Sequence, residues 1–137
     1  MKKIDSIYIV DDDPITVFGI SKMLGIVVEC NDITTFNNGK EALDDFIKRW
    51  DSNKKLPDVI FLDINMPIMD GWGFLDEFLK LEVSKKIRIN IITSSIDPVD
   101  YEKWLRYKQT THHFIDYKNK PVFKIEEQDI DHIDMAS

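Results

Sequence analysis

Carboxylate, hydroxyl and amine side chains follow short apolar segments at four separate places in this sequence. The residues at these places are Asp11, Asp12 and Asp13, then Asp63, then Thr93 and Ser94, and finally Lys120. Carboxylates that are brought together repel one another, and a bound cation or a nearby lysine relieves that repulsion. A carboxylate beside a cation, with a hydroxyl and an ammonium group opposite, is arranged to accept a phosphoryl group as an acyl phosphate. The residue types therefore point to phosphoryl chemistry, provided that the fold gathers them.

The expected cation is a hard divalent ion. Oxygen ligands without a His or Cys companion favour Mg²⁺, Ca²⁺ or Mn²⁺ over Zn²⁺, and Mg²⁺ typically shares a phosphate oxygen. We therefore expect Mg²⁺, with Mn²⁺ as the alternative, held by Asp11 and Asp12. Asp63 is the expected nucleophile because it ends the most continuously apolar segment, residues 59–62, which should be a central strand.

Apolar strand-like segments alternate with amphipathic helix-like segments five times. The expected strands are 7–10, 28 with 33–36, 59–62, 87–92 and 114–117, and the expected helices are about 14–27, 42–50, 72–81, 98–105 and 125–133. Asp13 before Pro14, and Asp97 before Pro98, are typical of a helix N-cap followed by the first helical residue. Such alternation predicts a parallel sheet covered on both faces, with one crevice at the carboxyl ends of the strands.

Composition excludes several classes of protein. The chain has 137 residues, of which 43% are hydrophobic, so we expect one packed globular domain and not a disordered or fibrous chain. Its net charge of −7 would repel a phosphate backbone, so we expect no nucleic-acid partner. Residues 1–6 lack the apolar region of a signal peptide behind them, and no apolar run is long enough to span a bilayer, so we expect no membrane association.

The cysteine and histidines have modest expected roles. Cys30 is the only cysteine, so no intrachain disulfide forms, and a reducing, cytoplasmic location is expected. We interpret Cys30 as a small buried hydrophobic residue. His112 and His113 lie at an expected strand start and should point to opposite faces, and His132 lies near the end of the chain. All three are interpreted as solvated or packing histidines.

The motifs around the chemical residues, taken together, resemble the receiver domain of two-component response regulators of the single-domain type. The matching segments are IVDDDP at 9–14, DVIFLDINMP at 58–67, MDG at 69–71, IITS at 91–94 and KP at 120–121. The likeness runs from about Ile7 to the last expected helix. It implies an α/β, flavodoxin-like, doubly wound (βα)5 fold with a five-stranded parallel sheet in the order 2-1-3-4-5.

The resemblance also implies a role for each matching residue at the acidic end of the site. Asp63 would be the phosphoacceptor, and Asp12 a direct magnesium ligand. Asp11 would be a water-mediated or supporting ligand, and the backbone carbonyl of Asn65 a further ligand. Asp13 falls at a variable position of the family, which agrees with its interpretation as a helix cap.

Further roles and partners follow from the same resemblance. Thr93 and Lys120 would hold the phosphoryl group, and Tyr117 would be the aromatic that turns inward when Thr93 moves toward the phosphate. The implied phosphodonor is a sensor histidine kinase or a histidine phosphotransfer protein. A downstream protein partner would bind the face formed by the fourth helix, the fifth strand and the fifth helix.

Part of this output region departs from the family pattern. The interval from Thr93 to Lys120 is a few residues longer than usual, and we expect the additional residues within 103–108. Trp104 is interpreted either as an exposed partner anchor or as a core residue. Asp116 and Lys118 are unusual at their positions in the fifth strand, which leaves the register of Tyr117 open.

The expected organisation is a single receiver domain over residues 1–137, with a core at about 7–133 and no output domain. The short segment after Lys120 suffices for one helix and a tail. The signal would then leave through protein contacts, as in a phosphorelay intermediate; the alternative is a fragment of a longer protein.

The expected function is a phosphoaccepting switch, which is not a metabolic enzyme and catalyses only its own phosphorylation and dephosphorylation. Two other functions are alternatives to it. One is a hydrolase that uses Asp63 against phosphate esters, although Asn65 stands where such enzymes place a second aspartate. The other is a phosphorylation-independent interaction module, favoured by the altered fifth strand and the longer fourth-helix region.

Overall fold

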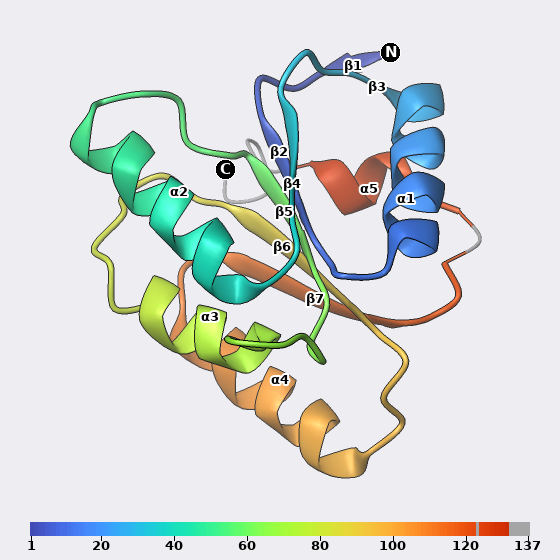
Figure 1. Cartoon of the computed structure of the whole chain (residues 1–137), viewed down its shortest axis with the longest axis vertical. Helices are drawn as coiled ribbons and strands as arrows, with labels where there is room; N and C mark the ends of the chain where they lie inside the picture. Colours follow the sequence, from blue (N-terminus) through green and yellow to red (C-terminus); the bar gives the residue numbers. More distant parts are fainter. Residues whose placement is uncertain (123, 132–137) are drawn as a thin grey trace.

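Parallel strands and helices alternate along the chain in the computed structural model, which describes residues 1–122 and 124–131 (Figure 1). The strands are β1 (Lys2–Lys3), β2 (Ile7–Val10), β3 (Val28–Glu29), β4 (Ile33–Phe36), β5 (Val59–Leu62), β6 (Arg88–Thr93) and β7 (Phe114–Asn119). The helices are α1 (Pro14–Val27), α2 (Gly39–Asp51), α3 (Gly71–Phe78), α4 (Pro98–Thr110) and α5 (Glu127–Ile130). Within these described residues, no helix combines the length and the apolar character that crossing a bilayer requires.

Five strands form the main sheet in the order β4-β2-β5-β6-β7, and every neighbouring pair is parallel. The predicted order 2-1-3-4-5 is therefore found in this sheet. All residues of β2, β5 and β6 are buried. Contact with helices on both faces explains why β2 and β5 are continuously apolar, whereas β6 also buries the polar residues Arg88, Asn90 and Thr93.

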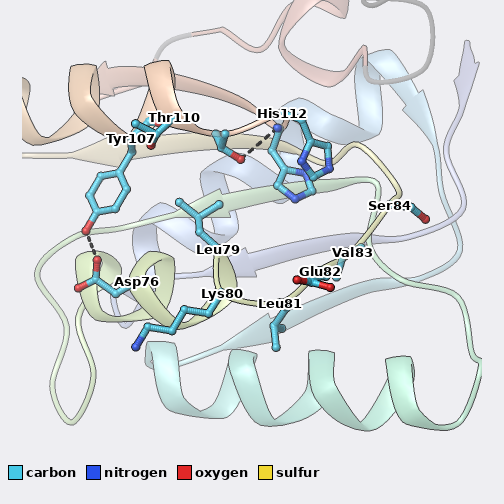
Figure 2. A pocket seen from close by; sticks show the side chains of 12 residues that line it. Asp76, Leu79, Lys80, Leu81, Glu82, Val83, Ser84, Tyr107, Thr110 and His112 are labelled. Atoms are coloured by element: carbon cyan, nitrogen blue, oxygen red, sulfur yellow. Dashed lines mark hydrogen bonds between the residues drawn. The ribbon is translucent and has the colours of Figure 1, made fainter.

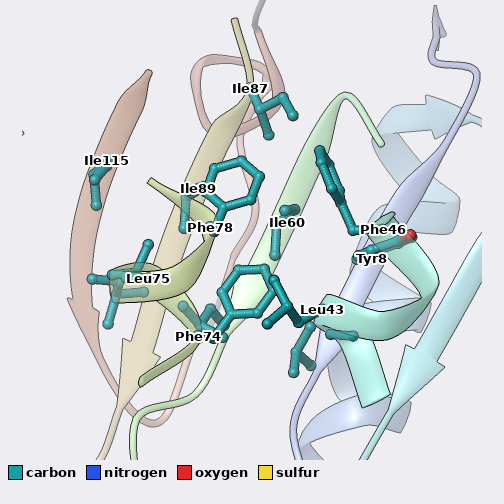
Figure 3. Close-up of a cluster of buried hydrophobic side chains, with 14 of the residues drawn as sticks. Tyr8, Leu43, Phe46, Ile60, Phe74, Leu75, Phe78, Ile87, Ile89 and Ile115 are labelled. Carbon is teal, nitrogen blue, oxygen red and sulfur yellow. The ribbon is translucent and has the colours of Figure 1, made fainter. Parts of the chain in front are cut away.

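Helices cover the sheet on both faces, with α2, α3 and α4 on one side and α1 and α5 on the other (Figure 1). The core under α2 and α3 is rich in aromatic rings. Phe78 lies at its centre (Figure 3). Its ring centroid is 5.5 Å from that of Phe74, in a stacked arrangement, and 5.0 Å from that of Phe46, edge to face. The opposite core is aliphatic and includes Ile20 and Leu24 of α1. This three-layer packing holds the strand ends in fixed positions.

Capping side chains start the helices directly behind the strand ends. The Asp13 carboxylate accepts a hydrogen bond from the backbone N–H of Ile15 at 3.1 Å, and Pro14 is the first residue of α1. The Asp97 carboxylate likewise accepts from the N–H of Val99 at 2.9 Å, with Pro98 as the first residue of α4. Both predicted caps are confirmed, and they start α1 and α4 within a few residues of the strand ends where the chemical residues lie.

Several elements differ from the prediction: α3 ends at Phe78 instead of about residue 81, and α4 continues to Thr110 instead of about residue 105. Two further differences concern Val28 and the last helix. Val28 does not join the main sheet; β3 pairs with β1 in a separate two-stranded sheet that the polar Lys2–Lys3 segment did not indicate. The last helix was expected over residues 125–133; within the described part of that range α5 covers Glu127–Ile130 and Asp131 is extended, and residues 132–133 lie outside the described residues. Side chains of β6 explain this early end, because Asn90 donates to the Asp129 carbonyl and Arg88 donates to the Asp131 carbonyl.

The two adjacent histidines do not point to opposite faces as expected. Their ring centroids lie 4.0 Å apart, because both residues precede β7 in a bend and the alternation of a strand does not apply to them. His113 is a buried packing residue, and its Nδ1 accepts a hydrogen bond from the N–H of Ile87 at 3.0 Å. His112 is exposed. The third predicted packing histidine, His132, lies outside the described residues.

The buried His113 predicts a defined pH dependence of stability. Burial, together with the neighbouring His112, lowers the pKa of His113 to about 4, whereas an unfolded histidine titrates near ~6.5. The unfolded chain therefore binds more protons between these values, so His113 should destabilise the fold increasingly as pH falls from about 6.5 to 4. The effect should reach on the order of 3 kcal/mol at the acid end.

The measurement is urea denaturation of wild type and His113→Gln across this pH range. As pH falls, the free energy of unfolding of wild type should decrease more steeply than that of His113→Gln. The same comparison with His112→Gln, at an exposed position, should show a much smaller difference in slope. A pH-independent difference for His113→Gln would contradict the assignment of a buried neutral imidazole.

Candidate functional site

Backbone hydrogen bonds between strand ends bring the predicted site residues together. The N–H of Asp63 donates to the carbonyl of Val10 at 2.9 Å, so Asp63 lies beside Asp11, the residue after β2. The N–H of Lys120 donates to the carbonyl of Thr93 at 2.8 Å, which ties the residue after β7 to the end of β6. The parallel register thus gathers residues from four separate parts of the chain at one edge of the sheet.

Three aspartates and one lysine form a compact charged cluster. Oxygens of Asp11, Asp12 and Asp63 lie within 4.8 Å of one another. Lys120 Nζ lies 3.0 Å from Asp11 Oδ2 and 3.5 Å from Asp63 Oδ2. Asp11 and Asp63 are 4% and 5% exposed, whereas Asp12 is exposed. The cluster is therefore enclosed on the sheet side and open to solvent at Asp12.

Backbone donors orient the two buried carboxylates. Asp11 Oδ1 accepts from the N–H of Asp13 at 2.9 Å, and Asp63 Oδ1 accepts from the N–H of Ile64 at 2.8 Å. In each carboxylate the other oxygen is the one that faces Lys120. The geometry therefore leaves one oxygen of each carboxylate directed into the cluster.

Burial and mutual repulsion shift the pKa values of the cluster. Burial, and then the charge of Asp11, raise the pKa of Asp63 to about 6, although Lys120 opposes this shift. Burial also raises the pKa of Asp11. For Lys120, burial would lower the pKa, but the hydrogen bond and charge of Asp11 and the charge of Asp63 raise it overall. The lysine thus stays charged while the carboxylates remain crowded, and a divalent cation bound by Asp11, Asp12 and Asp63 would relieve that crowding.

Thr93 is fully buried at the end of β6, at the same edge of the sheet. Its Oγ1 accepts a hydrogen bond from the N–H of Ser95 at 3.0 Å, so its hydroxyl proton remains available for a second acceptor. Asn65, two residues after Asp63, is exposed in the loop that leads to α3. The roles of both residues toward a phosphoryl group and a metal ion stay predictions.

Gly71, part of the MDG segment at 69–71, contributes to the site through close packing that the sequence analysis did not assign to it. A Cβ atom at this position would lie 2.3 Å from the carbonyl oxygen of Asp63, so no larger residue fits without displacing the Asp63 backbone. The N–H of Gly71 also donates to the Ile64 carbonyl at 2.9 Å. The motif Asp70-Gly71 carried this signal, but the sequence did not reveal which backbone it approaches.

The aromatic residues near the fifth main strand pack against one another. Tyr117 is half-buried on β7, where its ring stacks on Trp104 at 5.6 Å and meets Tyr101 edge to face at 5.9 Å. Trp104 is half-buried, and its Nε1 donates to the Ile115 carbonyl at 2.8 Å. Trp104 therefore packs against the core instead of standing free as an exposed anchor, whereas Tyr101 is 44% exposed.

A cavity of about 610 Å³ lies elsewhere, between the ends of α3 and α4 (Figure 2). Its lining includes Leu79, Val83 and His112, and Tyr107, whose hydroxyl donates to Asp76. These residues surround the amino ends of β6 and β7, opposite the edge that holds the aspartates. The cavity is therefore separate from the charged cluster.

The family model for the response regulator receiver domain matches residues 7–122. This chain belongs to the response regulator receiver domain family. The matched range contains every member of the charged cluster as well as Thr93. Receiver domains are modules of two-component signalling and not metabolic enzymes.

Individual relatives agree with this family. The chain is 38% identical over 72 residues to a protein-glutamate methylesterase/protein-glutamine glutaminase of Methanococcoides burtonii, covering 53% of this chain and 19% of that protein. It therefore spans less than a fifth of that relative. A two-component response regulator of Cytophaga hutchinsonii has a TM-score of 0.71 and 28% identity, with 88% of this chain and 89% of that chain covered. The Mn²⁺-bound form of response regulator Rcp1 has a TM-score of 0.68 at 21% identity, with 95% and 86% covered.

Substitutions of the neighbouring residues Asp12 and Asp13 should affect cation binding differently. Asp12→Asn should weaken Mg²⁺ binding at least about ten-fold, equivalent to ~1.4 kcal/mol, because it removes a carboxylate from the cluster. Asp13→Asn should bind Mg²⁺ nearly as wild type does, because Asp13 caps α1 and asparagine is an equally good cap.

The measurement is the Mg²⁺ dependence of the thermal unfolding midpoint, since a ligand that binds only the folded state raises it. Equal Mg²⁺ responses of the two variants would contradict the assignment of Asp12 as a ligand.

Proposed function

We propose that this receiver domain accepts a phosphoryl group on Asp63 from a phosphohistidine donor, in a Mg²⁺-dependent reaction, and signals through protein contacts. One observation carries the proposal. Lys120 Nζ lies 3.0 Å and 3.5 Å from two buried carboxylates, Asp11 and Asp63, at an edge of the sheet that also presents the Thr93 hydroxyl. A lone cap or surface aspartate has no need of such an arrangement.

The proposed reaction is an in-line displacement at phosphorus. An oxygen of Asp63 forms a bond to the phosphorus as the phosphorus–nitrogen bond of the donor breaks, and the imidazole nitrogen keeps that electron pair and takes up a proton. The Lys120 ammonium group neutralises negative charge on the transferred phosphoryl oxygens, and the Thr93 hydroxyl donates a hydrogen bond to one of them. The product is an aspartyl phosphate on Asp63.

The proposed cation fits the donor set of the site. Asp11, Asp12 and Asp63, with the backbone carbonyl of Asn65, would hold Mg²⁺ or Mn²⁺, because oxygen donors of this kind suit both ions. When bound, the ion supplies positive charge that offsets the repulsion between carboxylates and phosphoryl oxygens. The similar structure of Rcp1 in a Mn²⁺-bound form supports this choice of metals.

The proposed donor would dock beside the aspartates, on the exposed start of α1. Ile15 and Phe18 are 82% and 64% exposed there, and a pocket runs from Asp11 and Asp12 to Phe18. Large apolar side chains exposed beside a reactive centre are typical of a protein-binding surface. The proposed donor is a sensor histidine kinase or a histidine phosphotransfer protein, because each carries a phosphoryl group on a histidine.

The proposed output surface is the face formed by α4, β7 and α5. No residue of α4 is fully buried, and Val99, Tyr101 and Leu105 of this helix are exposed apolar residues. Tyr117 of β7 lies beneath the α4 aromatics. We propose Tyr117 as the aromatic that responds when Thr93 engages the phosphoryl group, which would alter how α4 sits for a downstream protein.

Intact-mass analysis after treatment with acetyl phosphate and Mg²⁺ tests the proposal. We expect one phosphoryl group on wild type, stable in acid and labile in alkali, and no label on Asp63→Asn. Asp13→Asn should label as wild type does, because Asp13 acts as a helix cap.

Equal labelling of Asp63→Asn and wild type would contradict Asp63 as the acceptor. No label on wild type, combined with partner binding that is independent of a phosphoryl mimic, would instead favour the phosphorylation-independent module. Sustained turnover of a phosphate ester would favour the hydrolase.

A further inference from the structure

Asp100, on the first turn of α4, joins two segments that flank the phosphoryl site. Its Oδ1 accepts a hydrogen bond from Trp72 Nε1 at 2.9 Å, and its Oδ2 accepts from the hydroxyl of Ser95. The Trp72 indole is 6% exposed, and a buried indole N–H needs an acceptor in the interior. The bond from Ser95, and then that from Trp72, hold the pKa of Asp100 below its usual range. Asp100 is therefore a charged acceptor shared between two elements.

The Ser95 side of this junction leads directly to Thr93. The N–H of Ser95 donates to Thr93 Oγ1 at 3.0 Å, and the carbonyl of Ser95 accepts from Asn119 Nδ2 at 2.7 Å. Ser95 thus links the hydroxyl proposed to bind the phosphoryl group, the end of β7 and the start of α4. A shift of Thr93 toward Asp63 would pull on all three.

The Trp72 side leads to Asp63. Trp72 follows Gly71, the residue packed against the Asp63 backbone without room for a Cβ atom. The indole also stacks on Tyr107 of α4 at 5.4 Å, and Lys103 Nζ lies over it, 5.8 Å from the ring centroid. Because α4 has no fully buried residue, these contacts make up much of its attachment to α3.

We propose that Asp100 is a positioning residue that couples phosphoryl binding at Asp63 and Thr93 to the position of α4. It does so by holding Ser95 and Trp72 together in the unphosphorylated arrangement. Movement of Thr93 toward a phosphoryl group on Asp63 lengthens the Ser95 to Thr93 bond, releases the Ser95 to Asp100 bond and frees the start of α4. The inference rests on the proposed phosphorylation of Asp63, and it predicts that the Asp100 junction opposes phosphoryl binding.

The test is titration with beryllofluoride, a phosphoryl mimic, in the presence of Mg²⁺, followed by NMR of the indole N–H groups. The chain has three tryptophans, and Trp50→Phe and Trp104→Phe variants assign the Trp72 signal. In wild type the Trp72 signal should move on binding. Asp100→Ala should bind beryllofluoride about five-fold or more tightly than wild type, because the opposing junction is gone, and its Trp72 signal should move much less.

Two further variants make the result decisive. Ser95→Ala removes the bond to Asp100 Oδ2, and the 3.2 Å bond from the N–H of Asp97, but keeps the bond from Trp72 to Asp100. It should therefore also tighten binding while its unliganded Trp72 signal stays as in wild type, and it decides the test if Asp100→Ala fails to fold. Glu102→Ala removes the same charge from α4 at an exposed residue whose side chain makes no hydrogen bond or ion pair within the described residues, and its affinity should equal that of wild type.

The outcomes separate this inference from the proposed function. If wild type binds beryllofluoride but Asp63→Asn does not, the phosphoacceptor stands. In that case, wild-type affinity of both Asp100→Ala and Ser95→Ala would overturn the coupling role. Absence of binding by wild type, or equal binding by Asp63→Asn, would overturn the proposed function and this inference together.

Discussion

The enclosure of two carboxylates with one lysine is the constraint on which the rest of the site depends. Asp11 and Asp63 are nearly inaccessible, so their mutual repulsion is poorly screened by water. Lys120 offsets part of this repulsion by reaching both of them from the end of β7. A parallel sheet brings such groups together readily, because the ends of strands that are neighbours in the sheet place their side chains side by side. Three-layer packing then keeps the strand ends from separating to relieve the charge.

The main sheet and most of the site were predictable because their signals are local. Each site carboxylate ends an apolar strand, and Asp-Pro pairs mark the starts of α1 and α4. The order of the five main strands came from the resemblance to receiver domains, and the structure agrees with it. In these elements the side chains that set the local conformation are neighbours in sequence, so the sequence pattern predicts where the strands end and the helices begin.

The features that were mispredicted or missed depend on partners far away in the chain. The short β1 is a strand only because Val28–Glu29 lies beside it, and α5 ends early because β6 side chains bind its carbonyls. The sequence allowed Trp104 to be either exposed or buried, since its orientation depends on a hydrogen bond to the Ile115 carbonyl of β7. The junction at Asp100 is tertiary in the same sense, because nothing near it in sequence indicates an indole donor.

The helices differ in how firmly they are attached, and this difference bears on signalling. α3 buries Phe74, Leu75 and Phe78 in the aromatic core, whereas α4 has no fully buried residue and is held by half-buried aromatics and hydrogen bonds. An element with few buried contacts can change position at low cost in free energy. The proposed phosphoryl site thus adjoins a rigid helix on one side and a more readily displaced helix on the other.

A crystal structure of the protein with Mg²⁺ and beryllofluoride would test the central claim most directly. The account predicts the mimic on an Asp63 carboxylate oxygen, with the Lys120 ammonium and Thr93 hydroxyl on its fluorines and Mg²⁺ among the three aspartates. A mimic absent from Asp63 under saturating conditions, or bound there without Lys120 and Thr93, would contradict the claim that these strand ends form one phosphoryl-accepting site.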